Sequence, residues 1–346
     1  MHEAMLYERL DQQRVRCLLC AHGCLIPPGG RGICQVRENQ EGTLHSLVWG
    51  KPISGSVDPI EKKPLFHFLP GSTSYSIATL GCNFQCGFCQ NWNISQYPRQ
   101  EKGADIPGGG PQGRLVPPEQ IVRQALAQGC ASISYTYTEP TIYFEYAFDC
   151  MKLAVEQGLK NVFVSNGYES AQCVEACQGL LHAANIDLKS FRDDFYKSEC
   201  KARLQPVLDT LLAMRAAGLW LEVTTLIIPG RNDDPGELKE LTAFLARELS
   251  PEVPWHVSAY HPQYKYQDSG IGPTPVRTLE RALEIGKQAG LLYVYAGNVP
   301  GHDSESTACP GCGRRVVGRR GYRILGLDLN NGACPGCGRP IPGVWA

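Results

Sequence analysis

The chain has 346 residues, and its 33 Lys and Arg side chains nearly balance 34 Asp and Glu, for a formal net charge of −1. This balance gives no bulk electrostatic reason to expect nucleic-acid binding. No stretch approaches the roughly 18 apolar residues of a membrane span, and the charged start of the chain is unlike a secretory signal. Sixteen cysteines without an export signal predict metal and cluster ligation in a reducing compartment, hence a cytoplasmic, oxygen-sensitive protein.

A first group of cysteines lies in an N-terminal segment that we expect to span residues 1–70. It consists of Cys17, Cys20, Cys24 and Cys34. The irregular spacing does not match that of two-cluster ferredoxins. We expect zinc at these thiols, with an auxiliary iron–sulfur cluster as the alternative. His22 lies among them and is expected to be a bystander.

The second group is the most informative feature of the chain. Cys82, Cys86 and Cys89 have the spacing C-x3-C-x2-C, which fits on one short loop. Each thiolate can bind one iron of a [4Fe–4S] cluster, which normally has four cysteine ligands. Three ligands therefore leave one iron open to a small molecule with an amine and a carboxylate.

Two other interpretations of this cysteine triad remain open from the residues alone. The triad could bind zinc with a distant fourth ligand, or supply three structural thiols. Zinc sites usually pair C-x2-C knuckles with a matching partner pair, which the triad lacks. The strand-like run at 74–80 places the triad at the carboxyl end of a strand, where ligand sites of α/β barrels lie.

Strand-like and helix-like segments alternate from this point to about position 300. The expected strands are 74–80, 132–137, 161–165, 184–188, 220–227 and 255–260, and the expected helices include 143–156, 204–217 and 237–249. Repeated βα units imply a parallel sheet with right-handed crossovers. The fold class is therefore α/β, a partial (β/α)6 TIM-like barrel over residues 71–303. Cysteines inside it, such as Cys130 and Cys200, are expected to be small buried hydrophobes.

The third group closes the chain, in a small module expected at residues 304–346. Its ligands are Cys309, Cys312, Cys334 and Cys337, in two Cys-Pro-Gly-Cys-Gly knuckles. Four thiolates with no open position predict a structural zinc ribbon. A rubredoxin-like iron site has the same spacing and is the alternative.

The triad, with Phe88 directly before its last cysteine, resembles the radical S-adenosylmethionine (SAM) superfamily. The resemblance implies that the open iron holds the methionine part of SAM. It also implies that reductive cleavage then gives a 5′-deoxyadenosyl radical that abstracts hydrogen. A reductant of flavodoxin or ferredoxin type is implied as well, and Phe88 is expected beside the cofactor.

Motifs at the ends of later strands extend the resemblance. Glu139 follows the second strand where the superfamily has a Gly-Gly-Glu-type motif that contacts the SAM amino group, although Tyr137 and Thr138 replace the glycines. Capping of the next helix is an equally simple role for Glu139.

Further along the barrel, Ser165 and Asn166 resemble a Thr-Asn-Gly turn beside the cofactor, although Asn-Gly is also a plain turn signal. Asp187 and Lys189 resemble an Asp-x-Lys motif beside the substrate and cofactor, and we expect both to be catalytic, with Asp187 also binding the cofactor. His256 is expected to point into the barrel, either as a cofactor contact or as a core histidine.

The order of the three cysteine groups is similar over almost the whole chain to the radical SAM enzyme of the AmmeMemoRadiSam system, which resembles pyruvate formate-lyase activating enzyme. This implies association with AMMECR1-type and Memo-type proteins but gives no substrate. Activation of a glycyl-radical enzyme is one alternative function. A non-catalytic iron–sulfur and zinc scaffold or electron carrier is another.

Overall fold

A computed structural model describes residues 2–101, 105–109, 113–299 and 301–345. Its centre is one eight-stranded sheet in the order β14-β13-β12-β11-β10-β9-β8-β7. The strands are β7 (Ser54–Pro59), β8 (Thr73–Ala78), β9 (Ser132–Tyr135), β10 (Lys160–Ser165), β11 (Ala183–Asp187), β12 (Trp220–Ile227), β13 (Trp255–Ala259) and β14 (Val294–Gly297). Neighbours from β8 to β14 are parallel, and β7 pairs antiparallel with β8.

The sheet confirms the α/β fold class and all six expected strands, and it adds two more. β14 is a seventh parallel strand, and β7 forms the opposite edge of the sheet. β9 and β13 are buried along their whole length, as parallel strands covered on both faces are. Because β14 and β7 are the edges and do not pair, the barrel is open on one side.

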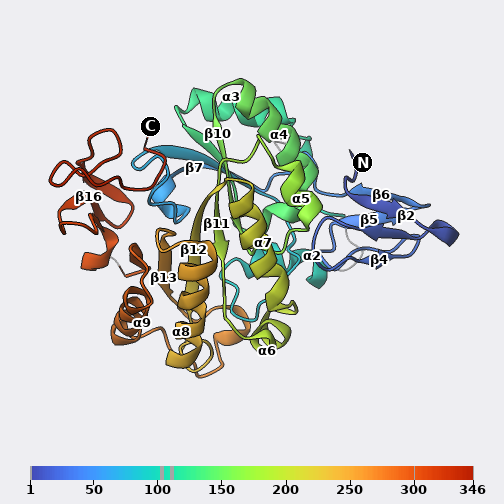
Figure 1. Ribbon diagram of the computed structural model, residues 1–346. Coiled ribbons are helices and arrows are strands. Elements are labelled where there is room, and N and C mark those ends of the chain that lie inside the picture. The colour runs from blue at the N-terminus through green and yellow to red at the C-terminus, as the bar shows by residue number, and fades with distance from the viewer. Residues whose placement is uncertain (1, 102–104, 110–112, 300, 346) are drawn as a thin grey trace.

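Helices connect the parallel strands and cover the outside of the sheet (Figure 1). The longer ones are α3 (Pro118–Ala127), α4 (Phe144–Glu156), α5 (Ala171–Ala176), α7 (Leu204–Ala216), α8 (Pro235–Phe244) and α9 (Val276–Gln288), and the short ones are α1 (Trp92–Ser95), α2 (Tyr97–Gln100) and α6 (Asp193–Phe195). The three helices expected from the sequence are confirmed. α8 begins where Asp234 caps the backbone N–H of Glu237, and a π-helical turn at Leu245–Leu249 continues it.

The N-terminal part folds into two small three-stranded sheets, in the orders β1-β6-β5 and β2-β3-β4. Their strands are β1 (His2–Glu3), β2 (Tyr7–Arg9), β3 (Val15–Cys17), β4 (Leu25–Ile26), β5 (Arg37–Gln40) and β6 (Thr43–Ser46). A buried ion pair of 2.9 Å between Arg37 and Glu145 joins this part to α4. Since β7 follows in the barrel sheet, the chain enters the barrel before the boundary expected near residue 70.

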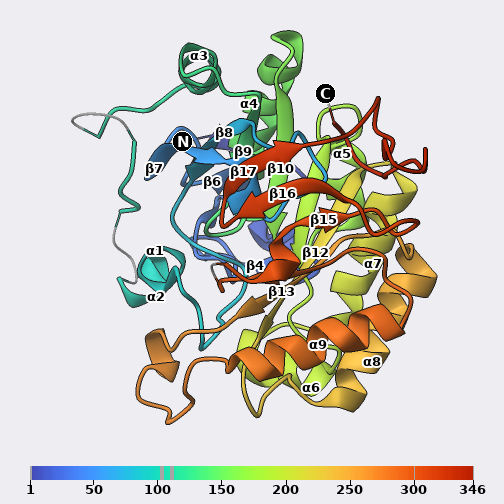
Figure 2. The ribbon, with the colours of Figure 1, turned by 90° about the vertical axis from the view of Figure 1, so that its left-hand side faces the viewer.

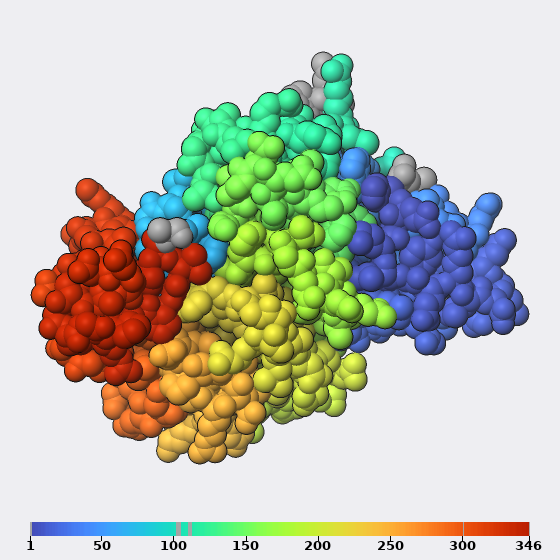
Figure 3. Space-filling view, turned by 45° about the horizontal axis from the view of Figure 1, so that its top comes forward, coloured from blue at the N-terminus to red at the C-terminus, as the bar shows by residue number. Residues whose placement is uncertain are grey.

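The C-terminal module lies on the other side of the barrel from the N-terminal sheets (Figures 1 and 3). It contains β15 (Thr307–Ala308), β16 (Arg315–Arg320) and β17 (Arg323–Leu327) in one antiparallel sheet. Figure 2 shows this sheet in front of the barrel strands. Phe66 and Tyr295 pack against Val316 and Val317 of the module in one buried cluster, so the module shares a core with the barrel.

No helix within the described ranges is both long and apolar enough to cross a bilayer.

Candidate functional site

The cysteine triad occupies the loop that leaves the carboxyl end of β8. Cys82 and Cys86 are buried and Cys89 is partly buried. The backbone N–H of Phe84 donates to Cys82 Sγ at 3.3 Å, and Cys89 Sγ lies 3.3 Å from Ser95 Oγ. Hydrogen bonds to sulfur are one of the ways in which a protein sets the potential of an iron–sulfur cluster.

The middle of this loop is held by the segment before α7. The N–H of Gln85 donates to Cys200 O at 2.9 Å, and that of Gly87 donates to Glu199 O at 3.2 Å. A hydrogen bond between Cys86 and Cys200, together with burial, raises the pKa of the Cys86 thiol well above its usual value. Cys200 is buried as expected, but its contact with the triad has no signal in the sequence.

Gly81 allows the loop to turn into the triad. Its φ is +98°, and a Cβ atom there would lie 2.8 Å from Val36 Cγ1. Both the left-handed backbone and the close approach favour glycine. We expect Gly81→Ala to lower the iron bound at the triad, because the loop must shift.

Gly129→Ala is the matched control for this prediction. Gly129 also has a positive φ, of +66°, but no atom lies within 4 Å of the place that a Cβ would take there. Iron analysis after anaerobic reconstitution measures the effect. Equal iron in the two variants would show that Gly81 does not position the triad.

A cleft of about 400 Å³ opens beside the triad at the carboxyl ends of the strands. Besides the three thiols, its walls include most of the expected site residues. These are Phe88, Ser165, Asn166, Asp187, Lys189 and His256. The position at this edge of the sheet matches that of ligand sites in α/β barrels.

Asp187 and Lys189 form an ion pair inside this cleft. Lys189 Nζ donates to Asp187 Oδ2 at 2.7 Å. Burial works against the ammonium charge, but Asp187 and the nearby Cys86 outweigh it and raise the pKa of Lys189 well above its usual value. The pair therefore presents one fixed cation and one carboxylate next to the triad.

Ser165 and Asn166 lie at the end of β10, and Asn166 reaches the triad loop. Asn166 Nδ2 donates to Asn83 Oδ1 at 2.7 Å and approaches Cys82 Sγ at 3.9 Å. Glu139 is fully buried and accepts from Ser165 Oγ and from the N–H of Asn166, both at 2.9 Å.

The arrangement around Glu139 gives it a capping role. It is the N-cap of the turn that begins at Pro140, accepting from Thr141 N, and it is not one of the residues that line the cleft. In this structure Glu139 thus positions Ser165 and Asn166. Its contact with a cofactor ammonium stays a prediction.

His256 faces the cleft and is also a paired core residue. Its Nε2 lies 2.7 Å from Glu222 Oε2. Glu222 is fully buried and accepts from the N–H groups of Phe66 and His67, at 2.9 and 2.7 Å. Burial alone would raise the pKa of Glu222, but its hydrogen bond with His256 and its other partners hold it below the usual value.

Asp58, Lys63 and Tyr137 form a cluster that the sequence patterns did not indicate. Lys63 Nζ donates to Asp58 Oδ2 at 2.8 Å, and Tyr137 OH donates to the same oxygen at 2.6 Å. Burial lowers the pKa of Lys63 to about 8, and both Lys63 and Tyr137 line the cleft. Tyr137 has a φ of +69°, so a bulky residue takes a glycine-like conformation at a position where the superfamily motif has glycine.

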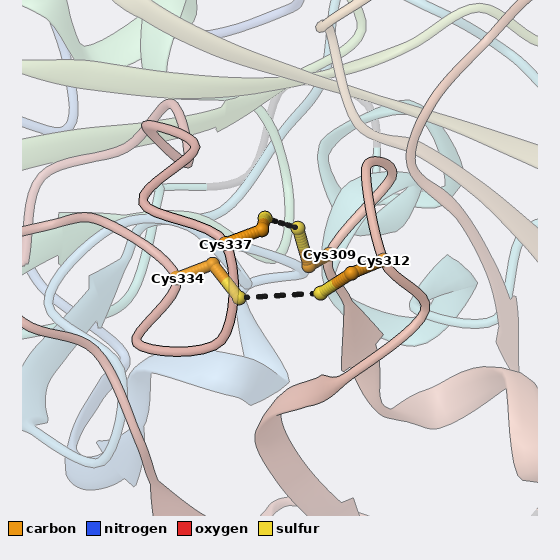
Figure 4. Close-up of side chains that lie close together, drawn as sticks. All are labelled: Cys309, Cys312, Cys334 and Cys337. Carbon is orange, nitrogen blue, oxygen red and sulfur yellow. Dashed lines mark hydrogen bonds between the residues drawn. The ribbon is translucent and has the colours of Figure 1, made fainter.

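The C-terminal cysteines converge on one point (Figure 4). The Sγ atoms of Cys309 and Cys337 lie 3.5 Å apart, and those of Cys312 and Cys334 lie 3.6 Å apart. All four lie within 4.8 Å of one another. Sulfurs around a tetrahedral ion with Zn–S bonds of about 2.3 Å are about 3.8 Å apart, so this group fits a single metal ion.

The N-terminal cysteines also face one another, but more loosely. All four, together with His22, line one small cavity between the N-terminal sheets and the barrel. No three of these thiols, all of which the structure describes, have Sγ atoms within 4.8 Å of one another. His22 Nε2 instead lies 2.9 Å from Asn83 O.

Residues 76–242, which include the triad and most of the cleft, match the family model described as "Radical SAM superfamily". This part of the chain is a radical SAM superfamily domain. The chain is also 46% identical over 331 residues, 95% of each chain, to the "Uncharacterized protein MJ0808" of Methanocaldococcus jannaschii.

Solved structures agree with the radical SAM fold. A radical SAM methyltransferase from Sphaerobacter thermophilus is 16% identical, with a TM-score of 0.51 over 70% of this chain and 71% of that chain. Streptococcus suis SuiB bound to precursor peptide SuiA is also 16% identical, with a TM-score of 0.50 over 70% of this chain and 52% of that chain. At these identities the likeness concerns the fold alone.

Proposed function

We propose that this radical SAM protein is an enzyme that uses a [4Fe–4S] cluster to cleave SAM and oxidise a substrate by hydrogen abstraction. The observation that carries the proposal is the triad itself. Three thiols on one loop border a polar cleft that has room for a cofactor. A cluster and SAM bound there would supply reductive cleavage of SAM to methionine and a 5′-deoxyadenosyl radical.

The residues around the triad suit both the cluster and SAM. Cys82, Cys86 and Cys89 would each hold one iron. Lys189 would bind the SAM carboxylate, and Asp187 would accept from its ammonium, each through a charge-assisted hydrogen bond. These two groups are already paired with each other, so their positions are fixed before a ligand enters.

Other residues would position the remainder of SAM and limit the entry of water into the cleft. Phe88 packs against Phe195 and Tyr266 and gives the cleft a rigid apolar wall. Ser165 and Asn166, held by Glu139, would orient polar atoms of the cofactor. Pre-positioned groups of this kind lower the entropy lost when reacting atoms are aligned.

The test is product formation by the anaerobically reconstituted protein. With SAM and dithionite as electron donor, 5′-deoxyadenosine and methionine should form in equal amounts. A protein with a full cluster that never releases 5′-deoxyadenosine would contradict the proposal.

A non-catalytic scaffold or electron carrier predicts a different result. It has no need of the Asp187–Lys189 pair beside the cluster, and it should not bind SAM. Calorimetric titration of the reduced protein with SAM separates the two functions. Saturable binding favours the enzyme, and absence of binding favours the scaffold.

The order of the three cysteine groups supports the AmmeMemoRadiSam subtype as the more specific proposal, with AMMECR1-type and Memo-type proteins as partners. Activation of a glycyl-radical enzyme is the alternative. Deuterium transfer from a labelled candidate partner protein into 5′-deoxyadenosine would identify the substrate. A glycyl doublet in the electron paramagnetic resonance spectrum of a partner would favour the activating enzyme instead.

We also propose that the C-terminal group binds one structural zinc ion. Cys334→Ser is expected to remove this zinc and to loosen the module locally, because metal binding contributes on the order of 10 kcal/mol to the folding of such small sites. Iron at the triad should stay unchanged. Zinc and iron per chain by elemental analysis measure both effects, and a loss of iron with unchanged zinc would identify a rubredoxin-like site.

A further inference from the structure

The C-terminal module forms part of the wall of the cleft that holds the triad. Tyr322, at the tip of the hairpin between β16 and β17, lines this cleft. The hairpin is tied to the barrel side, because Arg319 Nη2 donates to Phe66 O at 2.5 Å. Its tip is held within the module, where Gly321 N donates to Glu305 Oε2 at 3.0 Å. The tip of the hairpin therefore has a defined position beside the cleft.

A second hollow, of about 600 Å³, lies next to the cleft along the same hairpin. Glu61 and Tyr322 line both hollows, so the two are adjacent. We call the second one the hairpin groove, and its other walls are Pro59, Gly71, Ser72, Thr73, Arg320, Arg323 and Ile324. The cleft itself, at about 400 Å³, is near the lower end of the range for sites that hold one ligand. A substrate that joins SAM there needs additional space, and the groove provides it.

The hairpin groove carries two arginines that lack a carboxylate partner. Arg320 and Arg323 are both exposed and stand opposite each other in the register of β16 and β17, where like charges are destabilising. Neither has an ion-pair partner among the described residues, in which the ion pair of the module is that between Arg314 and Asp328. An anionic ligand would relieve the repulsion between the two guanidinium groups, so charge complementarity favours an acidic occupant of the groove.

β17 presents an unpaired strand edge that begins at the hairpin groove. It is the last strand in the order β15-β16-β17, and its first residue, Arg323, lines the groove. Leu325 and Leu327 lie on the same face of β17 as Arg323, and they are 60% and 46% exposed. Edges that are protected against association usually carry charges and not apolar side chains. An extended polypeptide can pair with such an edge as a further strand, which a small anion cannot do.

We propose that β17 and the hairpin groove bind an extended, acidic segment of a polypeptide and direct its acidic end past Tyr322 toward the cleft. Arg320 and Arg323 select acidic side chains, and the exposed leucines of β17 select apolar ones. That the segment is the substrate rests on the proposed function, whereas its binding does not. A second copy of this chain is a poorer occupant, because pairing of two β17 strands would bring the arginines of both chains close together.

The test measures the binding of short peptides with blocked ends to the full chain, by fluorescence anisotropy. The probe is Val-Thr-Val-Thr-Glu-Thr-Glu-Thr, which in antiparallel pairing places its valines opposite the leucines of β17 and its glutamates near Arg320 and Arg323. It should bind about tenfold more tightly than the same peptide with Lys in place of Glu, as expected for two exposed charge contacts. Equal affinity for the two peptides, or tighter binding of a short single-stranded RNA, would overturn the inference.

Arg320→Glu/Arg323→Glu should reverse the preference between the two peptides. Both side chains are exposed, so the fold should be kept. The matched control is Arg247→Glu/Arg277→Glu, which reverses two exposed arginines in the π-helical turn after α8 and in α9 and should leave the preference as in the wild type. An unchanged preference in Arg320→Glu/Arg323→Glu would show that the groove does not select the peptide.

Two N-methylated forms of the probe test the strand pairing. In an antiparallel pair, the N–H groups of a strand point alternately toward its partner and away from it. One form is methylated at Val and Glu and the other at Thr, so each form loses a different set of donors. One of the two should bind about tenfold more weakly than the other, the loss of one or two hydrogen bonds. Equal affinity of the two forms would contradict the pairing with β17.

A nitroxide label at either end of the probe tests its direction. A strand of this length spans about 25 Å, at about 3.4 Å per residue, so only its acidic end should lie near Tyr322 and the triad. Reduction of the triad cluster should therefore speed the relaxation of a label at the acidic end more than that of a label at the apolar end. Equal relaxation of both labels would overturn the inference.

The formation of 5′-deoxyadenosine without peptide measures the proposed function separately. Product without selective binding of the probe would refute this inference alone. Selective binding without product would support this inference and contradict the proposed function.

Discussion

Replacing Cys86 by alanine is expected to abolish formation of 5′-deoxyadenosine and to remove the cluster at the triad. Cys86 is buried in the middle of the loop, between the two other thiols, and no other side chain on this loop can bind iron in its place. A cluster with two cysteine ligands on one short loop lacks the normal ligand set. Product is measured by chromatography, and iron and sulfide by elemental and chemical analysis.

Cys130→Ala is the control for this variant. Cys130 is also buried, but it precedes β9, at the opposite end of the strands from the triad. Free buried cysteines behave as small hydrophobes, so this variant should keep both cluster and product formation. If Cys86→Ala formed as much 5′-deoxyadenosine as the wild type, the assignment of the triad as the catalytic cluster site would be wrong.

Glu222→Gln is expected to lower the free energy of unfolding at pH 7 by about 3 kcal/mol, the upper range for hydrogen bonds to a charged group. The Glu222 carboxylate is fully buried and accepts four hydrogen bonds, from Phe66 N, His67 N, Trp220 Nε1 and His256. A glutamine has only one oxygen, so its amide nitrogen would face donors. Denaturant unfolding of the two proteins measures the difference.

The pH dependence gives a second measure of Glu222. Because the pKa of Glu222 is held below its usual 4.5 in the folded protein, its ionised form stabilises the fold above that value. The stabilisation is lost as the pH falls through the folded-state pKa. Stability should therefore fall less steeply in acid for Glu222→Gln than for the wild type.

Glu248→Gln, at an exposed position of the π-helical turn after α8, is the control and should leave stability at pH 7 almost unchanged. Equal stability of Glu222→Gln and Glu248→Gln would show that the buried network does not hold the fold.

Much of the barrel could be predicted because its signals are local. The six expected strands are runs of apolar and β-branched residues bounded by turns, and the triad has a spacing that few other sites share. β7 was missed because Ser54–Pro59 is a mostly polar run with only Val57 as a large apolar residue. β14 was missed because its sequence, Val-Tyr-Ala-Gly, has only two residues that favour a strand.

The partners within the site could not be read from the chain in the same way. Tyr137 and Asp58 are 79 residues apart in sequence, and Glu222 and His67 are 155 apart. Nothing local marks such pairs, because each side chain alone is compatible with an exposed position. Glu139 differs from these residues, because its position was predicted but its environment was not. Its location at the end of a strand was predicted. Its burial, and its hydrogen bonds with Ser165 and Asn166, depend on how the neighbouring strand ends pack together.

The spacing of the cysteines along the chain already indicated which thiols form each group, because the length of a loop limits which cysteines can reach one metal centre. It did not determine what each group holds, since zinc and iron–sulfur sites have overlapping spacings. Only the tertiary structure showed that the four C-terminal sulfurs lie within 4.8 Å of one another, with two pairs 3.5 and 3.6 Å apart. These distances depend on how the two Cys-Pro-Gly-Cys-Gly knuckles face each other, and each close pair joins residues more than 20 positions apart in the chain.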